Sequence, residues 1–337
     1  MPCATAEQLE LYNSRLYTVA LFFNLAIALG SLVLIYKAIR KIYGEPSTIN
    51  ISTRIFLVVG LLTCLLHQSA YSVLRIQIVY QVLFRLDEPC ELYYVSHDCR
   101  FVTYGLVAGN SGMILIQSAM TIDRFFATLF PSAWPRLKHW PGVVLSVLVI
   151  AGNFVVNTVV FWEDPMTDHV FNCGSLPPKS VSRFKMSLVV AFFMSIAHMA
   201  LNVVFLGVNV WQDRRQRLVA DDRRRTFNVN ERYQSREKLK STQAIFFLSM
   251  SQFVFMFVYT ILTEYLVSIQ PSISPLQYGL ALALIYTTPY TCVAIPALIM
   301  FTLYFIKSQR MRSINEMRHQ TETGDEHMKK IQAFWNK

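Results

Sequence analysis

Seven separate stretches of this chain are long and apolar enough to cross a lipid bilayer. A hydrocarbon core of about 30 Å requires about 20 mostly apolar residues in an α-helix. The stretches cover residues 16–36, 55–74, 101–122, 141–162, 186–211, 241–269 and 276–306. Backbone amides in lipid must be hydrogen-bonded within their own segment, so each stretch is expected to be a helix. The sequence therefore predicts an all-α membrane protein that folds as a seven-transmembrane helix bundle.

The charge distribution predicts how this bundle is oriented. The chain has 337 residues, is 53% hydrophobic, and carries a formal net charge of +10. Of its 31 Lys and Arg residues, 24 lie in the alternate connections 37–54, 124–140 and 212–240 and in the tail 307–337. Loops rich in Lys and Arg stay in the cytoplasm, which places the N-terminus, residues 1–15, outside. This asymmetry argues against a nucleic-acid partner. The basic excess can serve only to orient the chain, which requires no ligand, or it can also contact anionic membrane lipids or an acidic protein on the inner face.

Four of the six cysteines lie on the predicted outer side, where disulfides persist. They are Cys3, Cys90, Cys99 and Cys173, and four cysteines allow three pairings. We favour a Cys99–Cys173 bond, because it would pin the loop between spans four and five over the bundle. Cys3 and Cys90 either pair with each other or stay free.

Span three ends in the triplet Asp123-Arg124-Phe125, and Arg124 follows Cys99 by 25 residues. At 1.5 Å per residue that separation is about 37 Å of helix, enough to reach from one interface to the other. An outer Cys paired with an inner Asp-Arg-aromatic triplet resembles rhodopsin-like G-protein-coupled receptors. The resemblance implies that Arg124 pairs with Asp123 at rest and reaches a G protein when the helices part. Spans five and six lack proline, so the other switch elements of that group are not transferred.

The loop before span six contains Asn-Val-Asn-Glu-Arg-Tyr-Gln at residues 228–234. Together with Thr-Ile-Asp-Arg-Phe at 121–125 and the chain length, this run is similar to the nematode serpentine receptors of class alpha or of the sister class alpha-beta. The likeness covers essentially the whole chain. It implies a chemosensory receptor of the plasma membrane of sensory neurons, including their cilia. Its implied partners are a heterotrimeric G protein and a small-molecule or peptide chemical cue.

The cytoplasmic side offers two patterns of its own. Arg232, Arg236 and Lys240 recur every four residues, so they share one face of a helix that is expected to extend span six inward. That face is either a solvated surface or a G-protein contact. In the tail, Met311 and Met317 lie on one apolar side among basic residues, which predicts a short amphipathic helix on the inner leaflet.

Polar residues within the spans are the candidate ligand contacts, because buried polar groups need partners. The candidates are His67, Asn110, His198, Tyr259 and Tyr286. Each of them taken alone is better explained by a hydrogen bond between helices. Gly105 and Gly109 form a G-x-x-x-G pattern, which indicates close helix packing.

No catalytic, metal or cofactor motif stands out. The spans contain no lysine for a retinal Schiff base. The histidine and cysteine spacings do not suggest zinc, and phosphate-loop and nucleophile-elbow motifs are absent. We therefore expect a receptor without enzymatic activity, cofactor or metal.

The alternative is a seven-span ligand-gated cation channel of inverted topology. The chain's one N-glycosylation sequon, Asn50-Ile51-Ser52, separates the two hypotheses. The receptor topology places Asn50 in the cytoplasm, and the channel topology places it outside.

Overall fold

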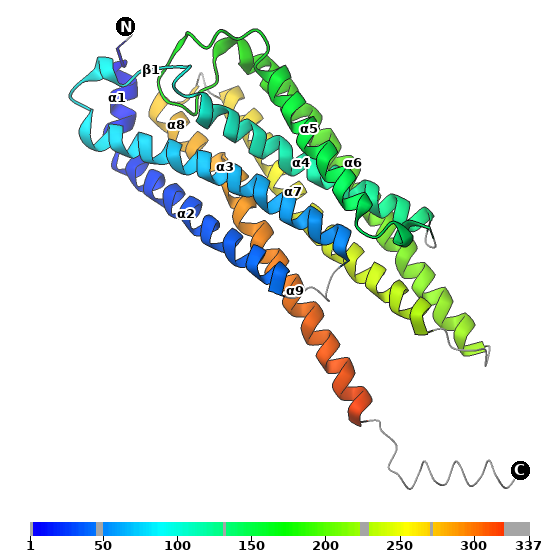
Figure 1. The fold of residues 1–337 in the computed structure, drawn as a ribbon. Coiled ribbons are helices and arrows are strands. Elements are labelled where there is room, and N and C mark those ends of the chain that lie inside the picture. The colour runs from blue at the N-terminus through cyan, green and yellow to red at the C-terminus, as the bar shows by residue number, and fades with distance from the viewer. Residues whose placement is uncertain (1–2, 45–49, 131–132, 223–228, 270–271, 320–337) are drawn as a thin grey trace, which may run out of the picture.

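The computed structural model is a bundle of long, roughly aligned helices (Figure 1). The structure describes residues 3–44, 50–130, 133–222, 229–269 and 272–319. The α-helices are α1 (Ala6–Asn13), α2 (Arg15–Gly44), α3 (Ile51–Phe84), α4 (Arg100–Leu129), α5 (Trp140–Val160), α6 (Pro178–Asp222), α7 (Val229–Ile269), α8 (Pro275–Ile285) and α9 (Thr288–His319). The short elements are the 3-10 helices η1 (Pro89–Glu91) and η2 (Trp134–Leu137) and the strands β1 (Tyr94–Val95) and β2 (His169–Val170).

Seven membrane-length apolar segments are present among these residues, which confirms the predicted seven-span, all-α fold. The segments differ in how deeply they are buried. Two thirds of the membrane-length apolar segment of α4 is buried, against 22% of the corresponding segment of α5. The exposed side of α5 consists of large apolar side chains such as Ile150 and Phe154. α4 is therefore the central helix, and α5 presents an apolar face suited to lipid.

Close packing of α3 against α4 depends on two glycines. A Cβ built on Gly109 would lie 2.8 Å from the His67 Cα, and one built on Gly105 would lie 2.7 Å from the Ala70 Cβ. Neither distance is compatible with a side chain. The G-x-x-x-G pattern therefore marks a helix contact, as predicted, and the contact is between α3 and α4.

The seventh span is broken, whereas the sequence predicted one helix over residues 276–306. α8 ends at Ile285, Tyr286 is extended with a ψ of 91°, and α9 begins at Thr288. Pro289 explains the break, since proline lacks an N–H and is accommodated in the first turn of a new helix. Side-chain hydrogen bonds hold the segment around the break against α3 and α7: the Gln68 Nε2 donates to the Pro289 carbonyl at 2.8 Å. The Thr287 hydroxyl donates to the Phe255 carbonyl at 3.0 Å.

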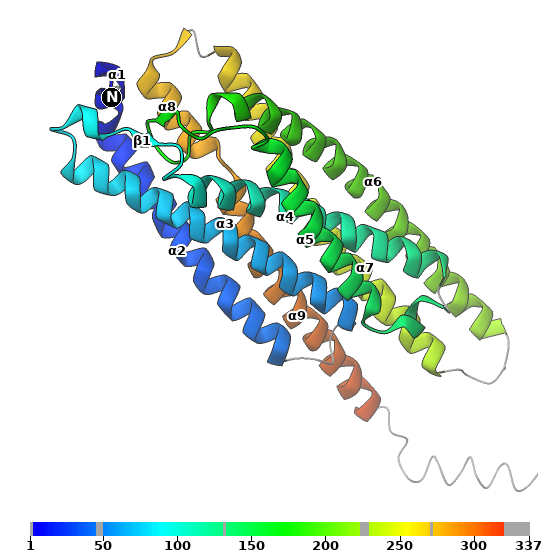
Figure 2. The same ribbon diagram turned by 45° about the horizontal axis from the view of Figure 1, so that its top comes forward.

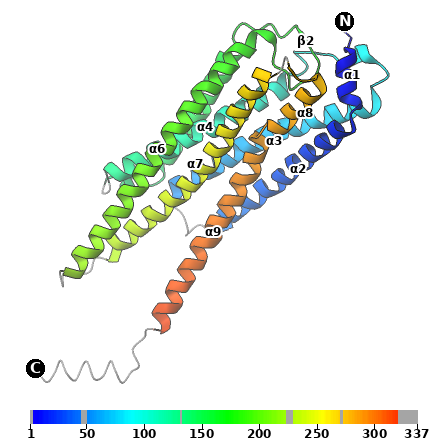
Figure 3. The ribbon, with the colours of Figure 1, turned by 180° about the vertical axis from the view of Figure 1, so that it is seen from behind.

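Helices extend beyond the bundle at the end opposite α1 (Figures 1 and 3). α7 begins at Val229 and runs without interruption into its apolar part, so the predicted extension of span six is confirmed. α9 also continues to His319 as one helix. A separate amphipathic helix was expected after residue 306, but the described part of the tail prolongs α9 instead, because nothing in 306–319 breaks the helix.

Two disulfides tie loops at the α1 end of the bundle. Cys99 is bonded to Cys173, as predicted, and Cys3 is bonded to Cys90, which the sequence left open. Between them β1 pairs antiparallel with β2, with Tyr94 opposite Val170. The loop that carries β1 lies at the same end of the bundle as α1 and α8 (Figure 2). The pairing joins the loop after α3 to the loop after α5, so one layer of backbone covers this end.

The glycine contact generates a stability prediction. Gly109→Ala should lower the thermal midpoint of the purified protein by several degrees, because overpacking a tight contact costs about 1–3 kcal/mol. Gly30→Ala is the matched control, since a Cβ there meets nothing within 4 Å. That substitution should leave the midpoint unchanged or raise it slightly, because Ala favours helix by up to ~1 kcal/mol. Equal midpoints for the two variants would contradict the contact.

Candidate functional site

One candidate site is a buried ion pair at the end of the bundle opposite the disulfides. Asp123 and Arg124 lie in the last turns of α4 and are 1% and 4% exposed. The Arg124 Nε donates to the Asp123 Oδ2 at 3.1 Å, and a second guanidinium nitrogen contacts the same oxygen. Arg124 also donates to the Thr53 hydroxyl on α3 at 3.2 Å. The guanidinium is therefore held inside the bundle by the carboxylate of Asp123 on its own helix and by the hydroxyl of Thr53 on the neighbouring helix α3.

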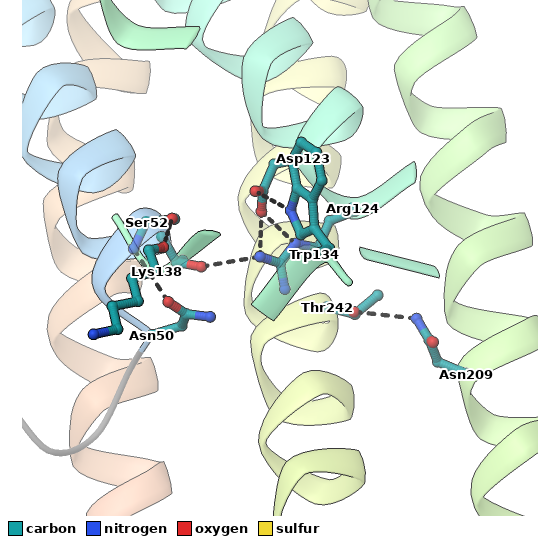
Figure 4. Close-up of polar contacts among 9 residues, drawn as sticks. Asn50, Ser52, Asp123, Arg124, Trp134, Lys138, Asn209 and Thr242 are labelled. Carbon is teal, nitrogen blue, oxygen red and sulfur yellow. Dashed lines mark hydrogen bonds and ion pairs between the residues drawn. The ribbon is translucent and has the colours of Figure 1, made fainter. Parts of the chain in front are cut away.

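Trp134, in the connection after α4, adds a further contact, and we call Asp123, Thr53 and Trp134 together the cage around Arg124. Its indole Nε1 donates to the second oxygen of Asp123, Oδ1, at 3.0 Å (Figure 4). The indole stacks on Phe126 with ring centroids 4.9 Å apart, which fixes its position. Each oxygen of the Asp123 carboxylate thus has a donor, which offsets the cost of burying the charge.

The same connection is fastened to the start of α3. The Ser52 hydroxyl donates to the Lys138 carbonyl at 3.0 Å, and the Ser52 amide donates to the Asn50 side chain at 3.2 Å (Figure 4). A Cβ on Gly142 would lie 2.8 Å from the Ser52 Cα. The ends of α3, α4 and α5 are therefore locked together around the ion pair.

Phe125, the third residue of the triplet, lies outside the cage. It is 41% exposed and its ring centroid is 6.0 Å from that of Phe205 on α6. Deeper in the bundle, Asn202 of α6 is fully buried. Its amide donates to the hydroxyls of Thr121 on α4 at 3.3 Å and Ser249 on α7 at 3.2 Å. One side chain thus links three helices close to the ion pair.

A second candidate site is a cavity of about 260 Å³ at the disulfide end. It is bordered by α2, α3, α4, α6, α7 and α8 and is covered by the loop that follows β2. We call it the loop-covered cavity. Its polar lining consists of Tyr17, Tyr71, Arg75, Thr103, Asn110, Asn172, Ser175, Tyr259 and Tyr286, and its apolar lining includes Leu74, Ile78, Leu106, Val107, Phe184 and Leu282.

The loop over this cavity is held in place by a disulfide on one side and by aromatic packing on the other. The Cys99–Cys173 disulfide fixes it to α4, and the Thr103 hydroxyl donates to the Cys173 carbonyl at 3.3 Å. From the other side Tyr12 of α1 packs on Phe171, with ring centroids 4.7 Å apart. Burial raises the pKa of Tyr12, so its hydroxyl stays protonated and donates to the Gln81 side chain at 3.3 Å.

Three of the five predicted ligand contacts lie together in the structure, and two do not. Asn110, Tyr259 and Tyr286 come together in the lining of the loop-covered cavity. His67 does not line it, but its Nε2 lies 2.7 Å from the Tyr286 hydroxyl. His198 lies apart on α6, is 7% exposed, and its Nδ1 has no hydrogen-bond partner among the described residues.

Sequence reasoning missed several residues of both sites. Arg75 was assigned to an outer loop because the predicted span ended at Leu74, whereas α3 continues to Phe84. The signal was available, since His67, Tyr71 and Arg75 are spaced by four and share one helix face. Thr53, Trp134 and Asn202 gave no comparable signal, because their partners are distant in the sequence.

The predicted G-protein contacts can be only partly located. Arg232, Arg236 and Lys240 belong to α7, which extends beyond the bundle at the Arg124 end (Figure 3). Their side chains lie outside the described residues.

A further hollow of about 370 Å³ lies between α4, α5 and α6. Its lining is almost entirely apolar and includes exposed side chains such as Val159, Met186 and Val190. This hollow opens on the apolar surface of the bundle, which distinguishes it from the loop-covered cavity with its many polar groups.

A seven-helix membrane bundle with a covered polar cavity at one end and a caged Asp-Arg pair at the other has the architecture of a seven-transmembrane receptor. Comparison with known families agrees: the family model described as "Serpentine type 7TM GPCR chemoreceptor Sra" matches residues 1–335. The chain belongs to this family of serpentine chemoreceptors, as the sequence resemblance predicted, and is a multi-pass membrane protein.

Individual relatives match over nearly their whole length. Serpentine receptor class alpha-11 of Caenorhabditis briggsae is 60% identical over 336 residues, covering 99% of this chain and 98% of the relative. The protein of the same name from Caenorhabditis elegans is 59% identical over 335 residues, with the same coverage. Serpentine receptor class alpha-13 of Caenorhabditis elegans is 35% identical over 337 residues, covering 99% and 97%. All three are named as receptors, which is not a class of enzymes.

Proposed function

We propose that this protein is a G-protein-coupled chemosensory receptor. In this proposal the loop-covered cavity binds an extracellular chemical cue, a small molecule or a short peptide, and the Arg124 end activates a heterotrimeric G protein. The observation that carries the proposal is the cage around Arg124. A buried guanidinium held by Asp123 and Thr53 is a contact that can be broken and re-formed when helix ends move apart.

Orientation follows from the disulfides and the charges together. Both disulfides lie at the end that also holds α1, and disulfides persist outside the cell. The connections at the opposite end carry most of the basic residues. We therefore place the N-terminus outside and the Arg124 end in the cytoplasm, in the plasma membrane of sensory neurons and their cilia.

The proposed mechanism is a shift between two populations of the bundle. A ligand changes this equilibrium only if it binds one state more tightly than the other. Tyr286 is well placed to sense it, because it lines the cavity, lies at the break between α8 and α9, and contacts His67 on α3. Movement of the start of α3 relative to the end of α4 would then break the Thr53 contact, open the cage and expose Arg124.

In the open state the G protein would meet Arg124 together with the inward extension of α7. Arg232, Arg236 and Lys240 are proposed as its contacts on that helix, which projects from the bundle at this end (Figure 3). The alternative, a cation channel of inverted topology, is not favoured by the family of the chain or by its relatives, which are named as receptors.

Removal of the Arg124 guanidinium tests the coupling step. In cells that express the chain with a G-protein dissociation reporter, an active cue from a chemical panel should lose its response with Arg124→Ala. Surface expression should persist, because the substitution leaves the disulfide end intact. A full response in a variant with normal surface expression would refute the role of Arg124.

Loosening the cage should raise signalling without any cue. Thr53→Val keeps the side-chain shape but removes a hydrogen bond to a charged group, a contribution of about 1.5–3 kcal/mol. If the bond exists only in the resting state, basal G-protein dissociation should rise at least about tenfold, since 1.4 kcal/mol is a factor of ten. Thr158→Val on the exposed side of α5 is the control and should leave the basal level unchanged. An unchanged basal level in Thr53→Val would count against the cage.

Glycosylation tests the orientation. Asn50 caps α3 at the Arg124 end and begins the sequon Asn50-Ile51-Ser52. With this end in the cytoplasm, N-glycosidase treatment of the protein from animal cells should not change its electrophoretic mobility. A shift that disappears in Asn50→Gln would reverse the orientation and favour the channel.

A further inference from the structure

The loop-covered cavity contains a buried cation whose charge is not neutralised by any described neighbour. Arg75 lies on α3, lines the cavity and is only 6% exposed. Its Nε has no hydrogen-bond partner among the described residues. The ion pairs found in the described part of the chain involve other groups, namely Arg85, His97 and Arg124.

The surroundings of Arg75 hold the guanidinium without cancelling its charge. Its central carbon lies 4.6 Å from the ring centroid of Tyr71, one turn earlier on the same helix. The face of an aromatic ring attracts a cation, and stacking fixes the plane of the guanidinium. The lining of the cavity contains no Asp or Glu among the described residues. A charge buried in this way is unfavourable unless an anion accompanies it.

The chemistry of the partner follows from this geometry. A guanidinium presents its donors in a planar fork that matches the two oxygens of a carboxylate. The lining also contains apolar side chains, among them Leu74 and Ile78 on α3 and Leu106 on α4. A volume of about 260 Å³ holds roughly nine water-sized groups at ~30 Å³ each, so the apolar body must be small.

We infer that Arg75 is the anion-binding group of the loop-covered cavity and that the cue is a small organic carboxylate with an apolar body. This inference rests on the proposed function for its biological meaning, but carboxylate binding itself does not depend on G-protein coupling. Asn110 and Tyr286 also line this cavity, so they are available to a second polar group of the ligand.

Direct binding to the purified full-length chain tests the inference. The probes are hexanoate, octanoate and phenylacetate, each compared with the alcohol and the amine of the same skeleton. A ligand that binds only the folded state raises the thermal midpoint as its concentration increases. The carboxylates should raise the midpoint, and the alcohols and amines should not. Equal shifts with all three head groups, or no shift with any carboxylate at millimolar concentration, would overturn the inference.

Two substitutions assign the effect to Arg75. Arg75→Gln should abolish the carboxylate-dependent shift, and it should also raise the midpoint of the ligand-free protein because it removes an unneutralised buried charge. An arginine with a purely structural role predicts the opposite, a lower midpoint. Arg85→Gln is the control, because Arg85 lies just beyond α3 and already pairs with Glu88 and Glu91. Retention of the carboxylate shift in Arg75→Gln would overturn the assignment.

A parallel G-protein dissociation assay separates this inference from the proposed function. Both the anion site and the receptor function are supported if carboxylates bind and activate, and if their potency falls at least tenfold in Arg75→Gln. Carboxylates that bind through Arg75 without activating support the anion site and contradict the proposed coupling. Activation by alcohols or amines that is unaffected by Arg75→Gln supports the receptor function and overturns the anion site.

Discussion

The contact between α3 and α4 positions both candidate sites. Gly109 lets the backbone of α4 approach that of α3 beside His67, at a distance that any side chain would prevent. Towards the disulfide end this helix pair carries Arg75 and Asn110 in the lining of the cavity. Towards the other end it carries Thr53 and Arg124 in the cage. Because the two helices pack together from Ala70 and Gly105 down to Thr53 and Arg124, a shift between them would affect both candidate sites.

Polar side chains give this apolar bundle its specific links. Asn202 joins α4, α6 and α7, Gln68 joins α3 to the start of α9, and the Asn24 amide donates to the Ala283 carbonyl of α8. Hydrogen bonds between membrane helices contribute about 0.6–2 kcal/mol each. Such bonds are strong enough to select one arrangement of the helices. In the proposed mechanism a bound ligand would rearrange a few of them, and the break in the seventh span is a place where the helix can adjust.

The prediction of the spans succeeded because lipid imposes a simple length and polarity rule, and the same rule caused its main errors. The rule ended the second span before Arg75, since it treats a charge as a boundary, whereas α3 continues to Phe84. It joined residues 276–306 into one helix, although Pro289 starts a new one after the break at Tyr286. Among the five candidate ligand residues, the position within a span alone could not distinguish Tyr286, which lines the cavity, from His198, which does not. Distinguishing them requires the rotation of each helix about its own axis, and that rotation is set by packing.

The sequence by itself determined the all-α membrane fold, the family, and the position of the Asp-Arg-Phe triplet near the end of α4. These follow from local quantities: apolar length, the distribution of Lys and Arg, and short motifs. Only the tertiary structure decided that Cys3 pairs with Cys90, that Trp134 and Thr53 enclose the Asp123–Arg124 pair, and that Arg75 is buried beside a cavity. These are contacts between residues far apart in the chain or consequences of burial. They depend on how the helices pack against one another, which no local pattern encodes.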